Sequence, residues 1–446
     1  MGGEWCTVTV AELQREGILL VEDGNHGEYR PRPDEFVTAG VAFIRAADMD
    51  DGRVLFQSAA KINDCARKRI TKGIGSPGDV LLSHKGTVGK VALVPGDAPA
   101  FVCSPQTTFW RSRDERRLDR KYLYAFLRSP LFHAQLATRA GETDMAPYVS
   151  LTSQRGLSVL LPPLSEQRAV AHILGTLDDK IELNRRMSET LEAMARALFK
   201  SWFVDFDPVR AKAEGRDPGL PKHIADLFPD SFEESALGEI PKGWQVGPIL
   251  DHARLMSGGT PKTDRSEYWN GSIAWASAKD VSQSPGTFLV ATERTITARG
   301  LDGSATQMIP AFCSVVVARG ATTGRMVLFG RDMAMNQTCY ALASTTETPF
   351  ALYCRLRAEI DALVHAAHGS VFDTITTSTF TSSRIVLPPK TLLRAFEERA
   401  APLFLRVLES TRETRTVAAV RDTLLPKLIS GELRISDAER FVGKVA

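Results

Sequence analysis

The sequence predicts an α+β protein in which two globular domains are separated by an antiparallel two-helix coiled coil, with a pseudo-two-fold internal repeat. Two observations lead to this fold class. The chain has 446 residues, more than one ordinary domain holds, and its 43% hydrophobic and 24% charged residues are a globular composition. The chain also repeats itself at about half its length, which points to two copies of one architecture.

The repeat is clearest in two long helical stretches. Leu161-Pro162-Pro163 recurs as Leu387-Pro388-Pro389, a shift of 226 residues (388 minus 162). After each copy, apolar residues recur at alternating steps of three and four, which is the spacing of a coiled-coil seam. The same shift carries the first seam, in residues 170–202, onto the second, in residues 396–428. The sequence therefore predicts two equivalent long helices.

These helices need a partner. A helix of roughly 35 to 40 residues is ~55 Å long and cannot bury its apolar seam alone. The other helix of the same chain is the nearest partner, and antiparallel pairing would give the pair approximate two-fold symmetry. The alternative is two unrelated helices, each packed on its own domain. Within the seam, the polar Asn184 either fixes the register of the pair or lies at a water-exposed rim.

The globular parts repeat more loosely. Residues 78–93 (GDVLLSHKGTVGKVAL) align with residues 313–328 (CSVVVARGATTGRMVL). In both, a Gly-containing turn interrupts an apolar run before Gly-Lys or Gly-Arg opens the next, which predicts a β-hairpin with a basic residue near its tip. A shorter match joins residues 105–107 (PQT) to residues 336–338 (NQT).

These patterns divide the chain in order. A segment with several prolines and little periodicity joins the two halves. The predicted parts are a first domain at 1–162, a helix at 163–204, a linker at 205–242, a second domain at 243–389, a second helix at 390–431 and a tail at 432–446.

Composition and missing motifs exclude several classes of protein. The net charge is +2, so nucleic-acid binding requires local basic patches. No phosphate-binding loop, dinucleotide fingerprint, zinc motif or Asn/Asp-Pro-Pro-aromatic segment of an amino-methyltransferase is present, so we expect a non-catalytic protein. The cysteines form no CxxC pair, and neither a secretory signal nor a membrane-spanning run is visible, which favours a cytoplasmic protein.

Local charge points to a polyanionic partner. Basic side chains gather in three regions outside the long helices, and glycines beside some of them would let the backbone approach a phosphate. For any single cluster the alternative is an ordinary solvated face. The candidate DNA-binding residues are Arg67, Lys68, Arg69, Lys85, Lys90, Arg111, Arg113, Lys262, Lys279, Arg319 and Arg325. The repeated hairpin is the favoured contact element.

Several motifs carry a resemblance to one family. Residues 161–216 resemble the central conserved region of the specificity subunits of type I restriction-modification systems. Its most diagnostic pieces are SEQR at 165–168, LDDKI at 177–181 and FKSWF at 199–203. Three further motifs resemble other segments of the family. LLPKLISGE at 424–432 is similar to the distal conserved segment. GGTP at 258–261 and DGNHGE at 23–28 are similar to the openings of two different classes of target recognition domain.

The resemblance implies a fold and a function. It implies two target recognition domains held apart by conserved helices, each domain reading half of a bipartite, asymmetric DNA target. The implied partners are double-stranded DNA, two modification subunits and restriction subunits, with no membrane. S-adenosylmethionine, ATP and Mg would bind those partner subunits, and no cofactor is expected on this chain. Candidate contacts to the modification subunits are Leu177, Ile181, Trp202, Phe203 and Phe206, the last three being buried core in the alternative interpretation.

Two other classes of function remain open at this point. A coiled-coil adaptor without DNA affinity would explain the helices and leave the basic domains without a role. A self-contained nuclease or methyltransferase is opposed by the missing motifs.

Overall fold

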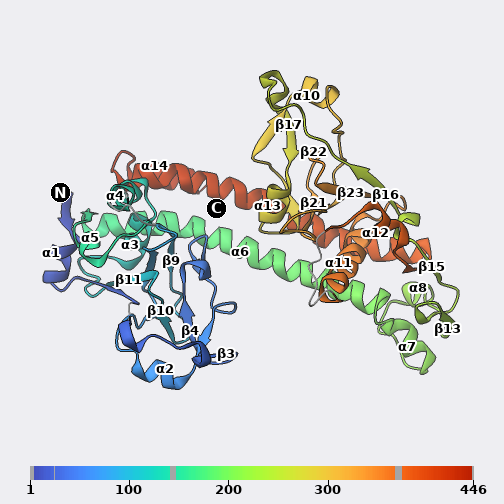
Figure 1. Ribbon diagram of the computed structural model, residues 1–446, viewed down its shortest axis with the longest axis horizontal. Coiled ribbons are helices and arrows are strands. Elements are labelled where there is room, and N and C mark those ends of the chain that lie inside the picture. The colour runs from blue at the N-terminus through green and yellow to red at the C-terminus, as the bar shows by residue number, and fades with distance from the viewer. Residues whose placement is uncertain (1–4, 25, 141–146, 367–373, 444–446) are drawn as a thin grey trace. The chain divides into compact units, whose positions relative to one another are not determined.

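The structure is a computed structural model that describes residues 5–24, 26–140, 147–366 and 374–443. The chain divides into two compact units (Figure 1). The first holds residues 1–181 and 416–446, and the second holds residues 182–415. Two helices of 40 residues each, α6 (Leu164–Phe203) and α13 (Lys390–Ile429), contribute to both units.

The first unit contains two four-stranded sheets. In the main sheet the order is β2 (Leu19–Asp23), β11 (Thr107–Ser112), β8 (Val80–Ser83), β9 (Val91–Leu93), all antiparallel. The second has the order β10 (Phe101–Cys103), β4 (Val41–Ile44), β7 (Lys61–Ile62), β3 (Phe36–Val37), with β10 and β4 parallel. Both faces of β8 are covered: Val80 and Leu82 pack with Trp110, while Leu81 packs with Phe109. That alternation is why β8 reads as a continuous apolar run.

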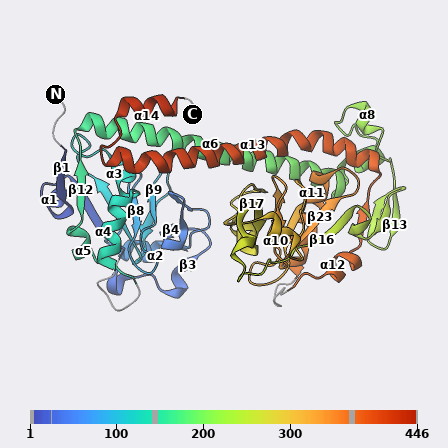
Figure 2. The ribbon, with the colours of Figure 1, turned by 90° about the horizontal axis from the view of Figure 1, so that it is seen from above.

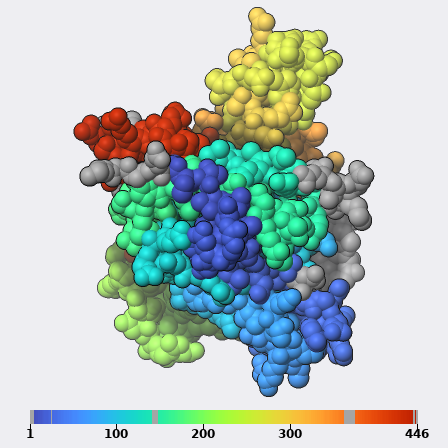
Figure 3. Space-filling view, turned by 90° about the vertical axis from the view of Figure 1, so that its left-hand side faces the viewer, coloured from blue at the N-terminus to red at the C-terminus, as the bar shows by residue number. Residues whose placement is uncertain are grey.

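Short elements complete the first unit. Its helices are α1 (Val10–Arg15), α2 (Asp64–Arg69), α3 (Arg120–Leu127), α4 (Pro130–Ala140), α5 (Leu151–Arg155) and α14 (Ile435–Val442). Strands β5 (Met49–Asp50) and β6 (Arg53–Val54) pair, and β1 (Cys6–Thr9) pairs with β12 (Ser158–Leu161). Figure 3 shows a face of this unit where its N-terminal segment (dark blue) and C-terminal segment (red) both reach the surface.

The second unit repeats this plan. Its five-stranded sheet has the order β16 (Ala253–Ser257), β23 (Cys339–Ser344), β20 (Ser314–Val317), β21 (Met326–Phe329), β18 (Phe288–Leu289). Its three-stranded sheet has the order β19 (Arg294–Ile296), β17 (Trp269–Ala276), β22 (Ala334–Met335), with β17 and β22 parallel. The remaining elements are α9 (Ala278–Gln283), α10 (Ala298–Asp302), α11 (Pro349–Ala366), α12 (Thr377–Ser382) and the pair β15 (Gln245–Gly247) with β24 (Ile385–Leu387).

The predicted repeat and hairpins are confirmed. Strands β2, β11, β8 and β9 correspond in order to β16, β23, β20 and β21. The hairpins expected in residues 78–93 and 313–328 are the antiparallel pairs β8–β9 and β20–β21. Each hairpin turns through two glycines with positive φ, Gly86 and Gly89 in the first, Gly320 and Gly324 in the second.

The long helices pack against each other in each unit (Figure 2). In the first unit, Leu177 of α6 lies in one buried cluster with Val417 and Leu424 of α13. In the second unit, the Phe199 and Phe396 rings are 5.5 Å apart, and Asn184 Nδ2 donates to Glu413 Oε2 over 2.8 Å. Contacts that advance along α6 recede along α13, so the pairing is antiparallel as predicted. Asn184 is 1% exposed and therefore belongs to the seam.

The segment after α6 is more structured than its composition suggested. It forms α7 (Asp207–Ala213), α8 (Lys222–Ala225) and the hairpin of β13 (Phe232–Ser235) with β14 (Gly238–Pro241). Aromatic side chains hold it to the helix end, with Trp202 against Phe228 at 5.2 Å and Phe206 against Trp244 at 5.6 Å. Trp202 and Phe203 are each 1% exposed. These aromatic residues are core of the second unit. Trp202, Phe203 and Phe206 are all buried, so their rings are not exposed for docking a partner.

Candidate nucleic-acid interface

Three strand ends meet at one edge of the main sheet in the first unit. β2 ends at Asp23, opposite Thr108, and β8 ends at Ser83, opposite Thr107, the first residue of β11. The segments beyond these ends touch, because the His84 amide donates to the Gln106 carbonyl over 2.9 Å. This edge therefore carries the loop after β2, the segment before β11 and the tip of the β8–β9 hairpin.

The second unit builds the same edge. β16 ends at Ser257, opposite Tyr340 of β23, and β20 ends at Val317, opposite Cys339. The amide of Ala318 donates to the Thr338 carbonyl over 2.8 Å, in the place of the contact between His84 and Gln106. Two different sequences thus present the same three segments side by side.

Glycine is required where the loop leaves the first strand of each edge. A Cβ on Gly24 would lie 1.9 Å from the Cys103 carbonyl oxygen, and one on Gly258 would lie 2.3 Å from the Asn336 carbonyl oxygen. No other residue fits against backbone at these distances. Gly24 of DGNHGE and Gly258 of GGTP therefore allow each loop to lie against the segment that carries the edge's glutamine.

Amide and cationic side chains project at both edges. Gln106 is exposed, and its side-chain amide makes no hydrogen bond to any residue in the described ranges. Gln337 lies one residue before the position that matches Gln106 in strand register; it is exposed and accepts a hydrogen bond from the Thr260 hydroxyl. Lys85 and Arg319 are exposed at the hairpin tips, where bridges to Tyr148 and Thr374 fix the backbone. Amides suit base edges and cations suit phosphates, so both edges carry side chains of the kinds that contact DNA in other proteins.

Four predicted DNA-binding residues are held by partners inside their own unit. Arg69 forms a two-point ion pair with Glu35, both contacts at 2.6 Å, and lowers the pKa of that carboxyl to about 2. Arg111 forms one with buried Asp79, at 2.6 and 2.8 Å. Lys90 is half-buried and donates to the Met49 carbonyl over 2.8 Å, and Lys279 pairs with Glu293 at 2.7 Å.

The other predicted basic residues are spread more widely. Lys262 is exposed in the loop after β16, and Arg325 is exposed beside Val317, whose amide donates to its carbonyl over 2.8 Å. Lys68 is exposed on α2, where half-buried Arg67 reaches the Ile70 carbonyl at 3.5 Å. Arg113 follows β11 at the sheet edge opposite Gln106. The structure thus gathers Lys85 in one unit, and Lys262, Arg319 and Arg325 in the other, near the two glutamines.

Two buried histidines flank the first edge. His26 Nε2 lies 2.9 Å from the Cys103 carbonyl, and His84 Nδ1 lies 3.0 Å from the Val149 carbonyl. Burial lowers the pKa of both imidazoles, so each is a neutral donor to its carbonyl. They are structural supports of the loop and hairpin. In the sequence, Gln106 and Gln337 stood out only as parts of a short repeat, and the strand register sets them one position apart.

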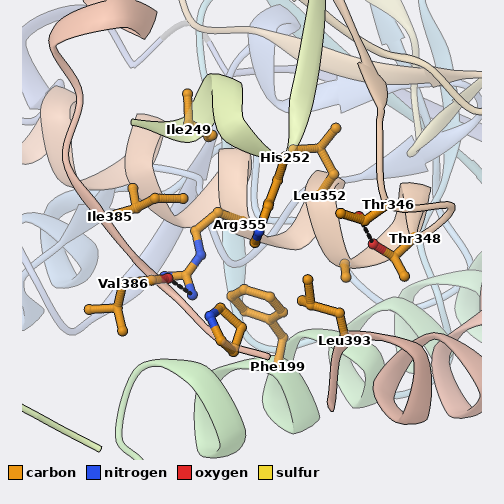
Figure 4. Close-up of a pocket in the computed structure, with 12 residues that line it drawn as sticks. Phe199, Ile249, His252, Thr346, Thr348, Leu352, Arg355, Ile385, Val386 and Leu393 are labelled. Carbon is orange, nitrogen blue, oxygen red and sulfur yellow. Dashed lines mark hydrogen bonds between the residues drawn. The ribbon is translucent and has the colours of Figure 1, made fainter. Parts of the chain in front are cut away.

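One small cavity and two buried thiols have features of core packing. A cavity of about 20 Å³ in the second unit lies between Phe199 and the partly buried Arg355, which donates to the Val386 carbonyl over 3.3 Å (Figure 4). Burial lowers the pKa of Arg355 to about 10. The space is too small for a substrate. Burial also raises the pKa of the Cys103 and Cys339 thiols to about 12, which keeps them un-nucleophilic.

Neither a metal-binding cluster nor a membrane-spanning helix is found among the residues that the structure describes. Among these residues, His, Cys, Asp and Glu side chains nowhere gather in threes that could hold a metal ion. Among the same residues, none of the helices is both long and apolar enough to pass through a bilayer.

Comparison with known proteins identifies the class to which this fold and interface belong. The model of the family described as "Type I restriction modification DNA specificity domain" matches residues 26–193 and 241–391. The chain therefore belongs to the family of type I restriction-modification DNA specificity subunits, as its motifs suggested.

Individual relatives agree. The chain is 26% identical over 444 residues to the Type I restriction enzyme HindI specificity subunit of Haemophilus influenzae, covering 88% of this chain and 94% of that protein. It is 23% identical over 412 residues to the MjaIX specificity subunit of Methanocaldococcus jannaschii, covering 90% and 89%. The crystal structure of the S subunit from M. genitalium matches with a TM-score of 0.54 at 13% identity, covering 95% and 96%, which supports the fold.

Proposed function

We propose that this chain reads a bipartite, asymmetric DNA target for a type I restriction-modification complex, one half-target per domain. The observation that carries the proposal is the edge built twice, with a glycine-held loop, an exposed glutamine and a basic hairpin tip in each unit. The loops differ in sequence, so the two halves of the target should differ as well. We place the first reading domain at residues 1–162 and the second at 243–389.

The long helices have a separate role in this proposal. The lengths of the helices at 163–204 and 390–431 set the gap between the two half-targets. Support comes from the continuity of α6 and α13, each of which forms part of both units. We assign residues 205–242 to a linker and residues 432–446 to a tail, which complete the proposed division.

Catalysis belongs to other subunits. The family assembles into type I complexes, and we propose that this chain binds two modification subunits, with restriction subunits joining them. S-adenosylmethionine, ATP and Mg would bind those partners. Leu177 is fully buried in the first unit, and Ile181 is partly buried beside it, so partner contacts are better sought on exposed helix positions.

The test is a map of methylated adenines. Cells that express this chain with its modification subunits should show a split motif with a fixed gap in single-molecule sequencing. Gln106→Ala should relax the motif in one half and Gln337→Ala in the other, because each amide serves one reading edge. A loss of about tenfold in discrimination at one position is expected for each. A continuous motif, or both variants altering the same half, would contradict the proposal.

A further inference from the structure

One arginine in the second unit is held by aromatic rings alone. Arg294, the first residue of β19, lies across from Trp275 of β17. Its guanidinium carbon is 3.5 Å from the centroid of Trp269 and 5.8 Å from that of Trp275. The side chain is exposed and makes no hydrogen bond or ion pair with any residue the structure describes. The neighbouring acid, Glu293, is paired with Lys279 at 2.7 Å.

The two indole rings beneath Arg294 are buried and are hydrogen-bonded to the loop after β16. The Trp269 and Trp275 rings are 5.2 Å apart at 87°, and both residues are buried. Trp275 Nε1 donates to the Gly259 carbonyl over 3.0 Å, and Trp269 Nε1 donates to the Lys262 carbonyl over 3.1 Å. The loop that anchors both indoles is therefore the one whose Thr260 bonds Gln337.

This arrangement suits one kind of ligand. Stacking on an indole face fixes the plane of a guanidinium and leaves its in-plane N–H donors free. Two such donors match the O6 and N7 acceptors of guanine in the major groove, the commonest specific contact of arginine with DNA. A side chain held in advance in that plane loses little rotamer freedom when it binds.

We propose that Arg294 is a specificity-determining residue that reads one guanine in the half-target of the second domain. The inference rests on the proposed function and deepens it. Among the described residues of the first domain, Phe43 occupies the position of Trp275, and Ala60, whose carbonyl accepts from the Phe43 amide, stands in the place of Arg294. The arginine contact is thus one source of asymmetry between the half-targets.

The test compares two conservative changes in the full chain, expressed with its modification subunits. Arg294→Lys keeps the charge and removes the planar pair of donors. Arg299→Lys is the matched control on exposed α10. Methylated-adenine mapping should show one G·C position of one half-target becoming degenerate in Arg294→Lys only. On duplexes that vary this position, discrimination should fall from about tenfold or more to about twofold or less.

Other outcomes overturn the inference or isolate it from the proposed function. Uniform weakening on every duplex with a shallower salt dependence would make Arg294 a phosphate contact. An unchanged motif would assign it a purely structural role. If Arg294→Lys is unstable by thermal melting, Arg294→Met, which keeps an apolar stem on the rings, must lose the same base preference. A wild-type chain without any split motif would refute the proposed function itself.

Discussion

At the residue scale, Glu397 shows how one side chain joins a domain to a helix. This residue of α13 accepts the amides of Phe350 and Ala351 over 3.1 and 3.0 Å, at the N-terminus of α11. Burial raises the pKa of its carboxyl from 4.5 to about 7. The folded protein therefore holds this proton more tightly than the unfolded chain. The resulting stability is full below about pH 4.5 and is lost as the pH rises through about 7.

Glu397→Gln should therefore remove part of the pH dependence of folding. The difference in unfolding free energy between the variant and wild type should shift in favour of the variant by roughly 2 kcal/mol from pH 5 to pH 8. The reason is that the wild-type carboxyl becomes charged over this range and glutamine does not. Urea unfolding at the two pH values measures this. Glu398→Gln, at the next and exposed position, is the control and should leave the difference as in wild type. Equal pH dependence in both variants would contradict the assignment.

At the element scale, Asp178 joins three helices of the first unit. It lies on α6 and accepts from Arg128, at the end of α3, over 2.7 Å and from Arg421, on α13, over 2.8 Å. The Arg421 side chain is 10% exposed and also reaches Asp422 at 2.9 Å. This geometry gives a structural reason for the acid within the LDDKI motif: its carboxylate neutralises a buried arginine between two helices.

Asp178→Ala should destabilise the first unit by about 3 kcal/mol, because removing one partner leaves the Arg421 charge buried with weaker compensation. Hydrogen exchange should accelerate in the amides of α3 and stay unchanged in those of α11, which belongs to the second unit. Asp179→Ala, at the adjacent exposed position, should have little effect. Similar acceleration of exchange in both variants would show that the ion pairs of Asp178 do not stabilise the first unit.

At the scale of the whole molecule, the proposed role of the helices as a spacer can be tested by length. Deleting one heptad from each helix at facing positions keeps the apolar seam in phase. Seven residues correspond to about 10 Å of helix, or about three base pairs of B-DNA. The gap in the methylated motif should shorten by about that number while both half-targets stay the same. Deleting about four residues from one helix alone should also alter the gap; an unchanged gap in either variant would reject the spacer.

How much the sequence could predict depended on the range of the forces involved. The seam of α6 and α13 follows from local periodicity, and the hairpins β8–β9 and β20–β21 follow from turns repeated in both halves. Pairing of basic residues could not be predicted in the same way. Glu35 is 34 residues from Arg69, and Asp79 is 32 residues from Arg111. Only the folded backbone brings these acids close enough to occupy the arginines.

Aromatic contacts were the second feature that could not be predicted from the sequence. The segment 205–242 has little periodicity, yet Phe228, Phe232 and Trp244 attach it to the end of α6 through irregularly spaced rings. Arg294 was one of several basic residues in its region, and the indole rings that distinguish it come from a different strand. The glutamines of the two edges were visible as a short repeat, but the strand order was needed to place each of them at an edge of its own sheet.

The composition of the first unit has a consequence for how a ribosome delivers this protein. Its α6 residues, such as Leu177, pack with Val417 and Leu424, which are made more than two hundred residues later. At about 5 to 20 residues per second, roughly ten to fifty seconds separate the two syntheses. During that interval the nascent N-terminal half carries an unpaired apolar stripe and is open to chaperones. A premature stop codon just before Thr416 would consequently remove part of the first unit, which is translated first, and leave the second unit, residues 182–415, complete.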